Sequence, residues 1–206
     1  MTNESIVFTI GHSNHTSERF VELLRQHGVT AVADVRSVPY SRIQPHFNRE
    51  SLKRMLKEHG IDYVFLGEEL GARTNDIACY ENGRVQYGRL ARTKAFSTGL
   101  DRVRSGSENH HIALMCSERE PLECHRMLLI GRELVTVGIH VAHIHADGHV
   151  ESHTDAVKRL LKHLGMPEQD LFRTPSDMIN EAYSRQEARV AYVDQQLVRE
   201  AREATP

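Results

Sequence analysis

Short apolar runs alternate with amphipathic segments along most of the chain. Five of the runs are brief and rich in β-branched residues, a pattern that predicts buried strands. They are IVFTIGHS, VTAVADVR, IDYVFLG, HHIALMC and HVAHIHA. The segments between them place apolar residues at helical spacing, with caps such as Ser17 and Asn48 and stops such as Gly28 and Gly60. This alternation predicts an α/β fold, a three-layer sandwich with a mostly parallel sheet and right-handed crossovers.

The remaining segments define the domain organisation. We expect further helices over residues 88–104, 121–136 and 152–165. Residues 68–87 have four glycine or asparagine residues and no sustained period, so we expect an irregular excursion of the kind that often covers a site. The chain becomes more polar from residue 167, and residues 176–203 have a helical pattern. We therefore predict one α/β domain over residues 1–166 and a C-terminal helical extension over 167–206 that packs on the domain or on a partner.

Composition narrows the classes of protein. Of the 206 residues, 39% are hydrophobic and 26% are charged, which is enough apolar material for a folded core. The 26 Lys and Arg nearly balance the 28 Asp and Glu, so any contact with nucleic acid or another polyanion must be local. The chain has neither an apolar run long enough for a membrane span nor a signal-peptide pattern, and its three cysteines suit a reducing compartment. We expect a cytoplasmic protein with no membrane partner.

Polar and reactive residues follow several of the predicted strands. In open parallel sheets, ligands bind beyond the carboxyl ends of the strands, so these residues should line one shared pocket. Gly11, His12 and Ser13 follow the first strand, Asp34 and Arg36 end the second, and Cys116 and Glu118 end the fourth. Arg36 can grip phosphate or carboxylate with Asp34 orienting it, or the two can form a structural salt bridge.

The densest cluster of reactive residues is CSEREPLECHR, from Cys116 to Arg126. We expect Cys124 and His125 in the opening turns of a helix, where backbone N–H groups and arginine favour a thiolate. His12 or His125 would then act as the base, and Arg126 would help to bind an anion. Zinc is an alternative, but the seven-residue gap and the roughly 100° between adjacent helical positions argue against it. Two buried, inert cysteines are a third interpretation.

Histidine is abundant, with 14 residues, but its pattern does not predict a second metal site. His143 and His145 share one face of a strand while His140 lies on the other, and no acidic residue recurs beside them. The chain also lacks a dinucleotide fingerprint after any strand, a GxxxxGK[ST] loop and a GxSxG elbow. NAD-dependent enzymes, P-loop NTPases and ordinary serine hydrolases are therefore disfavoured, and no cofactor is assigned.

Four ordered blocks give the chain a family resemblance. TIGHSNHTSERFVELL, VADVRSVPYSR, HFNRESLKRMLKEHGIDYVFLGEELGAR and ALMCSEREPLECHRMLLIGREL resemble the blocks of the domain of unknown function 488 family. The resemblance covers residues 6–150 and implies a compact α/β fold with a polar site, but no established substrate. The equivalent positions are Gly11, His12, Ser13, Asp34, Arg36, Pro39, Ser41, Phe47, Leu66, Gly67, Cys116, Glu118, Cys124, His125 and Arg126. One departure is the sequence LGEELGAR, where the family usually has LGG after the third strand.

Together these patterns favour an enzyme acting on a phosphorylated, nucleotide-like or nucleic-acid-derived ligand. The expected catalytic residues are Cys116, Cys124, His125, His12 and Glu118. The expected ligand-binding residues are Gly11, Ser13, Asp34, Arg36, Ser41 and Arg126. The alternatives are a non-catalytic module that binds an anion or a partner, and a metal-binding protein that uses Cys116, Cys124 and a histidine. The polar C-terminal helix offers a surface for oligomerisation.

Overall fold

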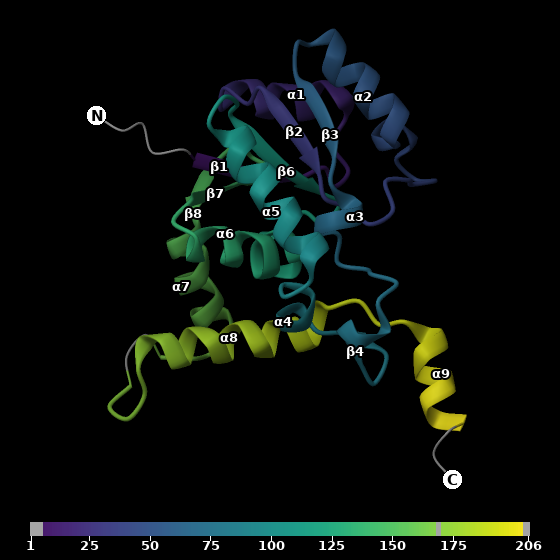
Figure 1. Ribbon diagram of the computed structural model, residues 1–206. Helices are drawn as coiled ribbons and strands as arrows, with labels where there is room; N and C mark the ends of the chain where they lie inside the picture. Colours follow the sequence, from purple (N-terminus) through teal and green to yellow (C-terminus); the bar gives the residue numbers. More distant parts are fainter. Residues whose placement is uncertain (1–5, 168–169, 204–206) are drawn as a thin grey trace.

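A six-stranded sheet forms the centre of the computed structural model, which describes residues 6–167 and 170–203 (Figure 1). Its strands are β1 (Ile6–Gly11), β2 (Ala31–Asp34), β3 (Asp62–Phe65), β6 (Ile112–Cys116), β7 (His140–Ile144) and β8 (Val150–Ser152). Their order is β3-β2-β6-β1-β7-β8, and all neighbours are parallel except β7 and β8. The first five correspond to the predicted runs. The short antiparallel β8 was not predicted, because its sequence VES has no apolar pattern.

Helices cover both faces of the sheet, which confirms the predicted three-layer α/β sandwich. Helices α1 (Ser17–Gln26) and α2 (Arg49–Glu58) pack on one face, where Phe20 and Leu52 join a core with Val32 and Met115 of the sheet. Helices α5 (Lys94–Ser107), α6 (Arg132–Thr136) and α7 (His153–His163) pack on the other, around Leu114. The sheet side chains alternate between these two layers because successive residues of a strand point to opposite faces.

The excursion between β3 and α5 has more structure than its sequence predicts. It contains α3 (Gly67–Leu70), a 3-10 turn (Ile77–Cys79), the hairpin of β4 (Tyr80–Glu81) and β5 (Arg84–Val85), and α4 (Tyr87–Leu90). Asn82 and Gly83 turn the hairpin with positive φ angles of 50° and 75°. The helix expected over residues 88–104 is therefore wrong in its bounds. Helix α5 begins only after Thr93, whose side chain accepts from the Phe96 N–H.

The C-terminal extension is two helices rather than the single one expected over residues 176–203. Helix α8 (Pro175–Val190) begins with a capping box at Thr174 and Asp177, and α9 (Gln195–Glu203) follows a break. At the break, the chain pairs with the β4–β5 hairpin, because the Val85 N–H donates to the Tyr192 carbonyl. Helix α8 buries Met178, Ala182 and Tyr183 in the same core as α5 and α7.

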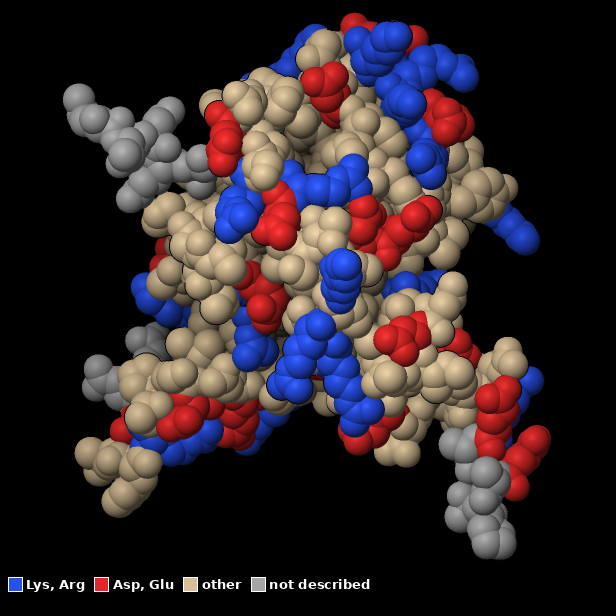
Figure 2. All heavy atoms as spheres, viewed as in Figure 1, with Lys and Arg blue, Asp and Glu red and all other residues tan. Residues whose placement is uncertain are grey.

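The surface matches the near-neutral composition. Figure 2 shows basic and acidic side chains intermixed on the viewed face, without a field of one sign. No helix in the described part of the chain is long and apolar enough to cross a bilayer.

Candidate functional site

The strand ends that the sequence singled out do meet at one edge of the sheet. Gly11 is paired with Cys116, and the backbone continues this pairing beyond the strands. The His12 N–H donates to the Cys116 carbonyl at 2.8 Å, and the Ser13 N–H donates to the Ser117 carbonyl at 3.0 Å. Asp34 is paired with Met115, the residue before Cys116.

The side chains at this edge divide between the two faces, so the single shared pocket expected from the sequence does not form. Asp34 lies in register with Met115, which belongs to the α1–α2 core, whereas Cys116 belongs to the core on the opposite face. The physical reason is the two-residue alternation of a strand, which separates neighbouring positions 115 and 116. The predicted residues therefore form two clusters.

The first group, here called the Arg36 cluster, consists of His12, Asp34, Arg36, Phe47 and Tyr63. Asp34 accepts from Arg36 Nε at 2.9 Å and from an Arg36 terminal nitrogen at 2.6 Å. Its carboxylate also accepts from the Tyr63 hydroxyl at 2.9 Å, and Arg36 donates to the Phe47 carbonyl at 2.8 Å. Asp34 is 0% exposed and Arg36 is 4% exposed. Asp34 and Arg36 thus form a buried salt bridge, which was one of the two sequence interpretations.

His12 completes the Arg36 cluster as a neutral imidazole. Its ring stacks on Phe47 with centroids 4.4 Å apart, its Nδ1 faces the Ser13 carbonyl at 3.0 Å and its Nε2 faces an Arg36 nitrogen at 3.3 Å. Burial, and then the positive charge of Arg36, lower the pKa of His12 from 6.5 to about 4. With Nδ1 donating to Ser13, Nε2 is left as the acceptor for Arg36.

The second group, here called the thiol cluster, consists of Cys116, Glu118, Cys124 and His125. One donor atom from each residue lies within 4.8 Å of all the others. The Cys116 and Cys124 thiols lie 2.8 and 3.0 Å from the same Glu118 oxygen, and each lies 3.7 Å from His125 Nδ1. Cys116, Cys124 and His125 are buried, while Glu118 comes from an exposed position in the loop after β6.

The local backbone explains how Cys124 and His125 converge, and it corrects the helix expected over residues 121–136. A 3-10 turn (Pro121–Glu123) ends at Cys124, which is extended with φ −133° and ψ 141°. A π-helix (Arg126–Gly131) then leads into α6. Because Cys124 is not helical, the angular argument against a metal site does not apply to it.

A backbone carbonyl fixes the orientation of His125. Its Nε2 lies 3.1 Å from the Val35 carbonyl, which can only accept a hydrogen bond. Nε2 therefore carries the proton, and Nδ1 presents its lone pair to the two sulfurs. This arrangement is the usual outer-shell support of a metal-binding histidine. Sequence reasoning missed Val35 because a carbonyl leaves no signal in the residue type.

The thiol cluster concentrates groups that are negative when deprotonated. Burial and the neighbouring Cys124 raise the pKa of Cys116. Although Glu118 as a residue is exposed, its carboxylate points back to the two thiols, and the resulting desolvation and the neighbouring Cys124 raise its pKa as well. Burial opposes ionisation of Cys124 as well, but the hydrogen bond from Cys116 and the charge of Arg126 bring its pKa below the usual value. Burial likewise lowers the pKa of His125, but the contact with Cys124 outweighs it and raises that pKa. Of the two thiols, Cys124 is therefore the one whose thiolate form the surroundings favour.

Two residues hold the loop that carries Glu118. Arg126 is 0% exposed and donates to the carbonyls of Glu118 at 2.6 Å and Arg119 at 3.0 Å. A side chain at Gly11 would place its Cβ 1.9 Å from the Glu118 carbonyl oxygen, so this position has room only for glycine. In this structure Gly11 and Arg126 position the loop.

The other predicted residues lie outside both clusters. Ser13 is partly exposed and donates to Asn14, and Ser41 closes a loop by accepting from the Gln44 N–H at 3.1 Å. His145 contacts Glu151 at 3.0 Å and lines a pocket that Arg119 also lines but that no residue of either cluster lines. Sequence reasoning also missed Tyr63. This residue of β3 is in register with Val32 of β2, which places it on the same face as Asp34.

Comparison with known proteins gives a family. The model of the family described as Domain of unknown function DUF488 matches residues 16–132, more than half of the chain. The chain belongs to the DUF488 family. No curated protein and no solved structure matches it. The part matched by the DUF488 model includes the whole thiol cluster and the Asp34–Arg36 pair, whereas Gly11, His12 and Ser13 precede it.

Proposed function

We propose that this DUF488 protein is a zinc-dependent enzyme that acts on a phosphorylated or nucleotide-like anion. The metal ligands are Cys116, Glu118, Cys124 and His125. The convergence of four donor atoms within 4.8 Å, at the edge of the sheet where ligands of open α/β folds bind, carries the proposal.

The spacing of the donor atoms suits a tetrahedral ion. A zinc ion with bonds of about 2.0 to 2.3 Å holds its ligand atoms about 3.5 Å apart. Both sulfur-to-nitrogen distances are 3.7 Å, and the sulfur-to-oxygen distances of 2.8 and 3.0 Å need only a small outward movement of the carboxylate. Two thiolates and an imidazole select zinc over magnesium or calcium, which prefer oxygen ligands.

The ligand set supports a catalytic centre rather than a purely structural one. Cys116, Cys124 and His125 are buried and held by the fold, but Glu118 is contributed by an exposed loop residue. A substrate oxygen or a water molecule that displaces this carboxylate would occupy the fourth position, as in catalytic zinc sites with three protein ligands. Zinc would supply Lewis acid chemistry, and the released Glu118 carboxylate would accept a proton.

Arg119 supports an anionic substrate. It follows Glu118 directly and lines the pocket of about 580 Å³ beside His145. In this pocket Glu120 and Glu151 pair with Arg159, which leaves Arg119 as the available cation. Its guanidinium has no hydrogen bond or ion pair to another residue within the described ranges 6–167 and 170–203. Arg36 and Arg126 instead direct their donors to Asp34 and to backbone carbonyls. We therefore assign the anion-binding role first to Arg119.

The metal content of the purified protein tests the proposed zinc centre. Protein produced without a histidine tag is expected to carry about one zinc per chain by elemental analysis, because the four ligands define one site. Cys124→Ser is expected to reduce the zinc content at least tenfold. Cys79→Ser provides the matched control, since Cys79 is also a buried cysteine but lies outside the thiol cluster. Equal zinc content in both variants, or none in the wild type, contradicts the proposal.

Phosphoester turnover tests the reaction class. With p-nitrophenyl phosphate and its diester as probes, the zinc-loaded protein is expected to turn over at least one, and chelation is expected to abolish the activity. Arg119→Gln is expected to raise KM with less effect on kcat, because it removes a contact to the anion in the ground state as well. Activity that survives in the metal-free protein would refute the catalytic role of the metal.

A further inference from the structure

We propose that two copies of this chain associate by exchanging residues 170–174, which precede α8 and are here called the loop. The side chains of Leu171 and Phe172 from each copy fill a pocket of the other copy, which lies beside the start of α8. The pocket and the loop share no residue with the thiol cluster, and the proposal does not depend on the proposed function.

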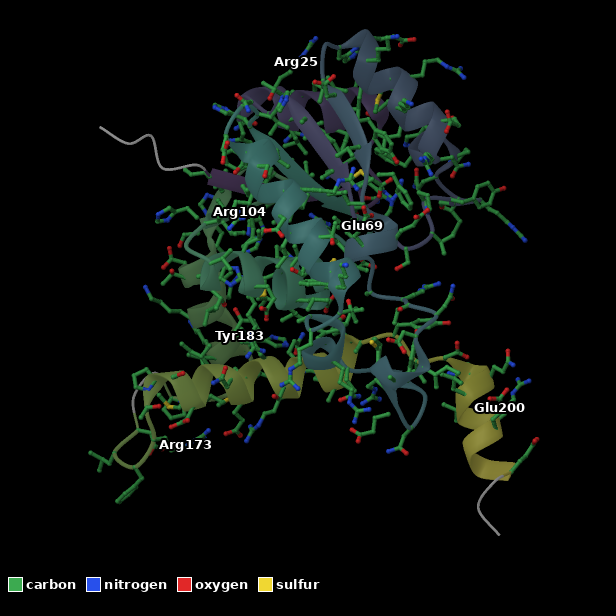
Figure 3. The ribbon with its side chains drawn as sticks, viewed as in Figure 1. Arg25, Glu69, Arg104, Arg173, Tyr183 and Glu200 are labelled. Carbon is green, nitrogen blue, oxygen red and sulfur yellow. The ribbon has the colours of Figure 1, made fainter. Side chains whose placement is uncertain are left out.

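The loop presents a conspicuous apolar pair to solvent. Leu171 and Phe172 are each 95% exposed, the largest values among the exposed large hydrophobic residues of the described chain. Asp170 turns the loop, because its carboxylate accepts from the Phe172 N–H at 2.8 Å. In Figure 1 this loop projects from the body of the protein at the start of α8, and Figure 3 places Arg173 at the same end. Such exposure of adjacent large apolar side chains marks an interaction site.

A pocket of matching character lies next to the loop. It has a volume of about 460 Å³ and opens between α6, α7 and α8. Its walls are mainly apolar, with Val157, Leu161, Met178 and Ile179, and Tyr183 also lines it. The volume accommodates one leucine and one phenylalanine side chain.

The charges of the loop and the pocket are complementary. The pocket lining includes Arg132 and Lys158 but no aspartate or glutamate. Arg132 has neutral partners there, since it donates to the Asn180 side chain at 2.9 Å and its guanidinium lies 4.7 Å from the Tyr183 ring centroid. Lys158 already forms an ion pair with Asp155 at 3.0 Å, so Arg132 is the pocket cation that Asp170, next to the apolar pair, would face. This acidic and apolar combination favours the loop over an uncharged occupant.

The position of the two features suits a twofold axis. Phe172 is three residues from Pro175, and Pro175 itself lines the pocket. An axis passing near the start of α8 would therefore bring both loops to both pockets at once, as a closed dimer requires. Because one aromatic side chain buries about 150 to 250 Å², the two exchanged pairs bury on the order of 600 Å². An area of that size lies below the roughly 1,200 to 2,000 Å² of a stable interface, so we expect a weak dimer, with a dissociation constant in the micromolar rather than the nanomolar range.

Sedimentation velocity at increasing protein concentration tests the exchange. The wild type is expected to shift from monomer to dimer, and the double variant L171S/F172S is expected to dimerise at least tenfold more weakly. Ile179→Glu should weaken the dimer to a similar extent, because it places a carboxylate where Asp170 would dock. Ile43→Ser is the matched control, since Ile43 is 86% exposed outside the loop and the pocket.

These measurements distinguish a pocket filled by the loop of a second copy from a pocket that binds a small ligand. Circular dichroism and zinc content must be unchanged in each variant, so that a folding defect is not read as lost association. A wild type that stays monomeric up to about 0.5 mM, where a micromolar dimer would be nearly complete, overturns the proposal. A dimer that persists in L171S/F172S and in Ile179→Glu also overturns it, because the interface then lies elsewhere. Binding of an amphipathic dye such as anilinonaphthalene sulfonate to a strictly monomeric wild type would assign the pocket to a small ligand instead.

Discussion

Replacing Asp34 with alanine is expected to lower the free energy of unfolding by about 3 to 5 kcal/mol, because Arg36 would keep a buried charge without its partner. Asp34 is 0% exposed, and it accepts from two side-chain nitrogens of Arg36 and from the Tyr63 hydroxyl. The substitution would leave Tyr63 unsatisfied as well. Urea unfolding of the wild type and the variant at neutral pH measures the difference.

Two controls distinguish the lost ion pair from general damage to the fold. The double variant D34L/R36M, which removes both charges and fills the space, is expected to be more stable than Asp34→Ala alone. The zinc content of Asp34→Ala is expected to remain at about one per chain, because the thiol cluster lies on the other face of the sheet. A loss of less than 1 kcal/mol in the single variant would contradict the account of this salt bridge.

Acidification is expected to destabilise the protein steeply between pH 6.5 and 4, because of buried histidines. Burial lowers the pKa of His153 from 6.5 to about 4, and burial together with Arg36 does the same for His12. Burial, and then His153, bring the pKa of His143 well below 6.5. In this pH range the unfolded chain binds protons that the folded chain excludes, so the free energy of unfolding decreases as the pH falls. Each pKa that is lowered to about 4 removes about 3 kcal/mol from the free energy of unfolding as the pH falls from 6.5 to 4.

Two of these buried histidines, His143 and His153, lie in a continuous chain of hydrogen bonds. Thr9 contacts His143 at 2.8 Å, His143 contacts His153 at 3.2 Å, and His153 contacts the Tyr183 hydroxyl of α8 at 2.8 Å. His153→Gln retains a polar partner for Tyr183 but removes one titrating group. The slope of the free energy of unfolding against pH is therefore expected to decrease by the equivalent of about one bound proton. His110→Gln, at an exposed histidine, is the matched control. Urea unfolding at several pH values measures both slopes, and parallel slopes in all three proteins would contradict this assignment.

Most of the fold was predictable because it depends on apolar periodicity. The five parallel strands and the helices on both faces follow from runs such as VTAVADVR and from stops at Gly28 and Gly60, although the N-cap of α1 is Thr16 rather than the expected Ser17. Three features were not predictable. The strand β8 is too short and polar to have a pattern, and the π-helix and the break after Val190 depend on tertiary contacts that the local sequence does not encode.

The sequence predicted which residues lie at the candidate site, but it did not predict how their side chains are arranged. The strand-end rule correctly brought Gly11, Asp34 and Cys116 to one edge of the sheet. It could not assign them to one pocket, because a shift of one residue along a strand moves a side chain to the opposite face. The extended conformation of Cys124 was also invisible in the sequence, although it is what turns this thiol toward Cys116 and His125. The sequence offered Cys116, Cys124 and a histidine as an alternative metal site, and the geometry added Glu118 and singled out His125 for the proposed ligand set.

X-ray absorption spectroscopy at the zinc edge, on protein purified without a tag, tests the central claim most directly. The account predicts two sulfur scatterers at about 2.3 Å and two nitrogen or oxygen scatterers at about 2.0 to 2.2 Å. Cys124→Ser is expected to lose this signal, and Cys79→Ser is expected to keep it. A first shell made only of nitrogen and oxygen, or a wild-type protein without bound metal, would contradict a zinc centre built from Cys116, Glu118, Cys124 and His125.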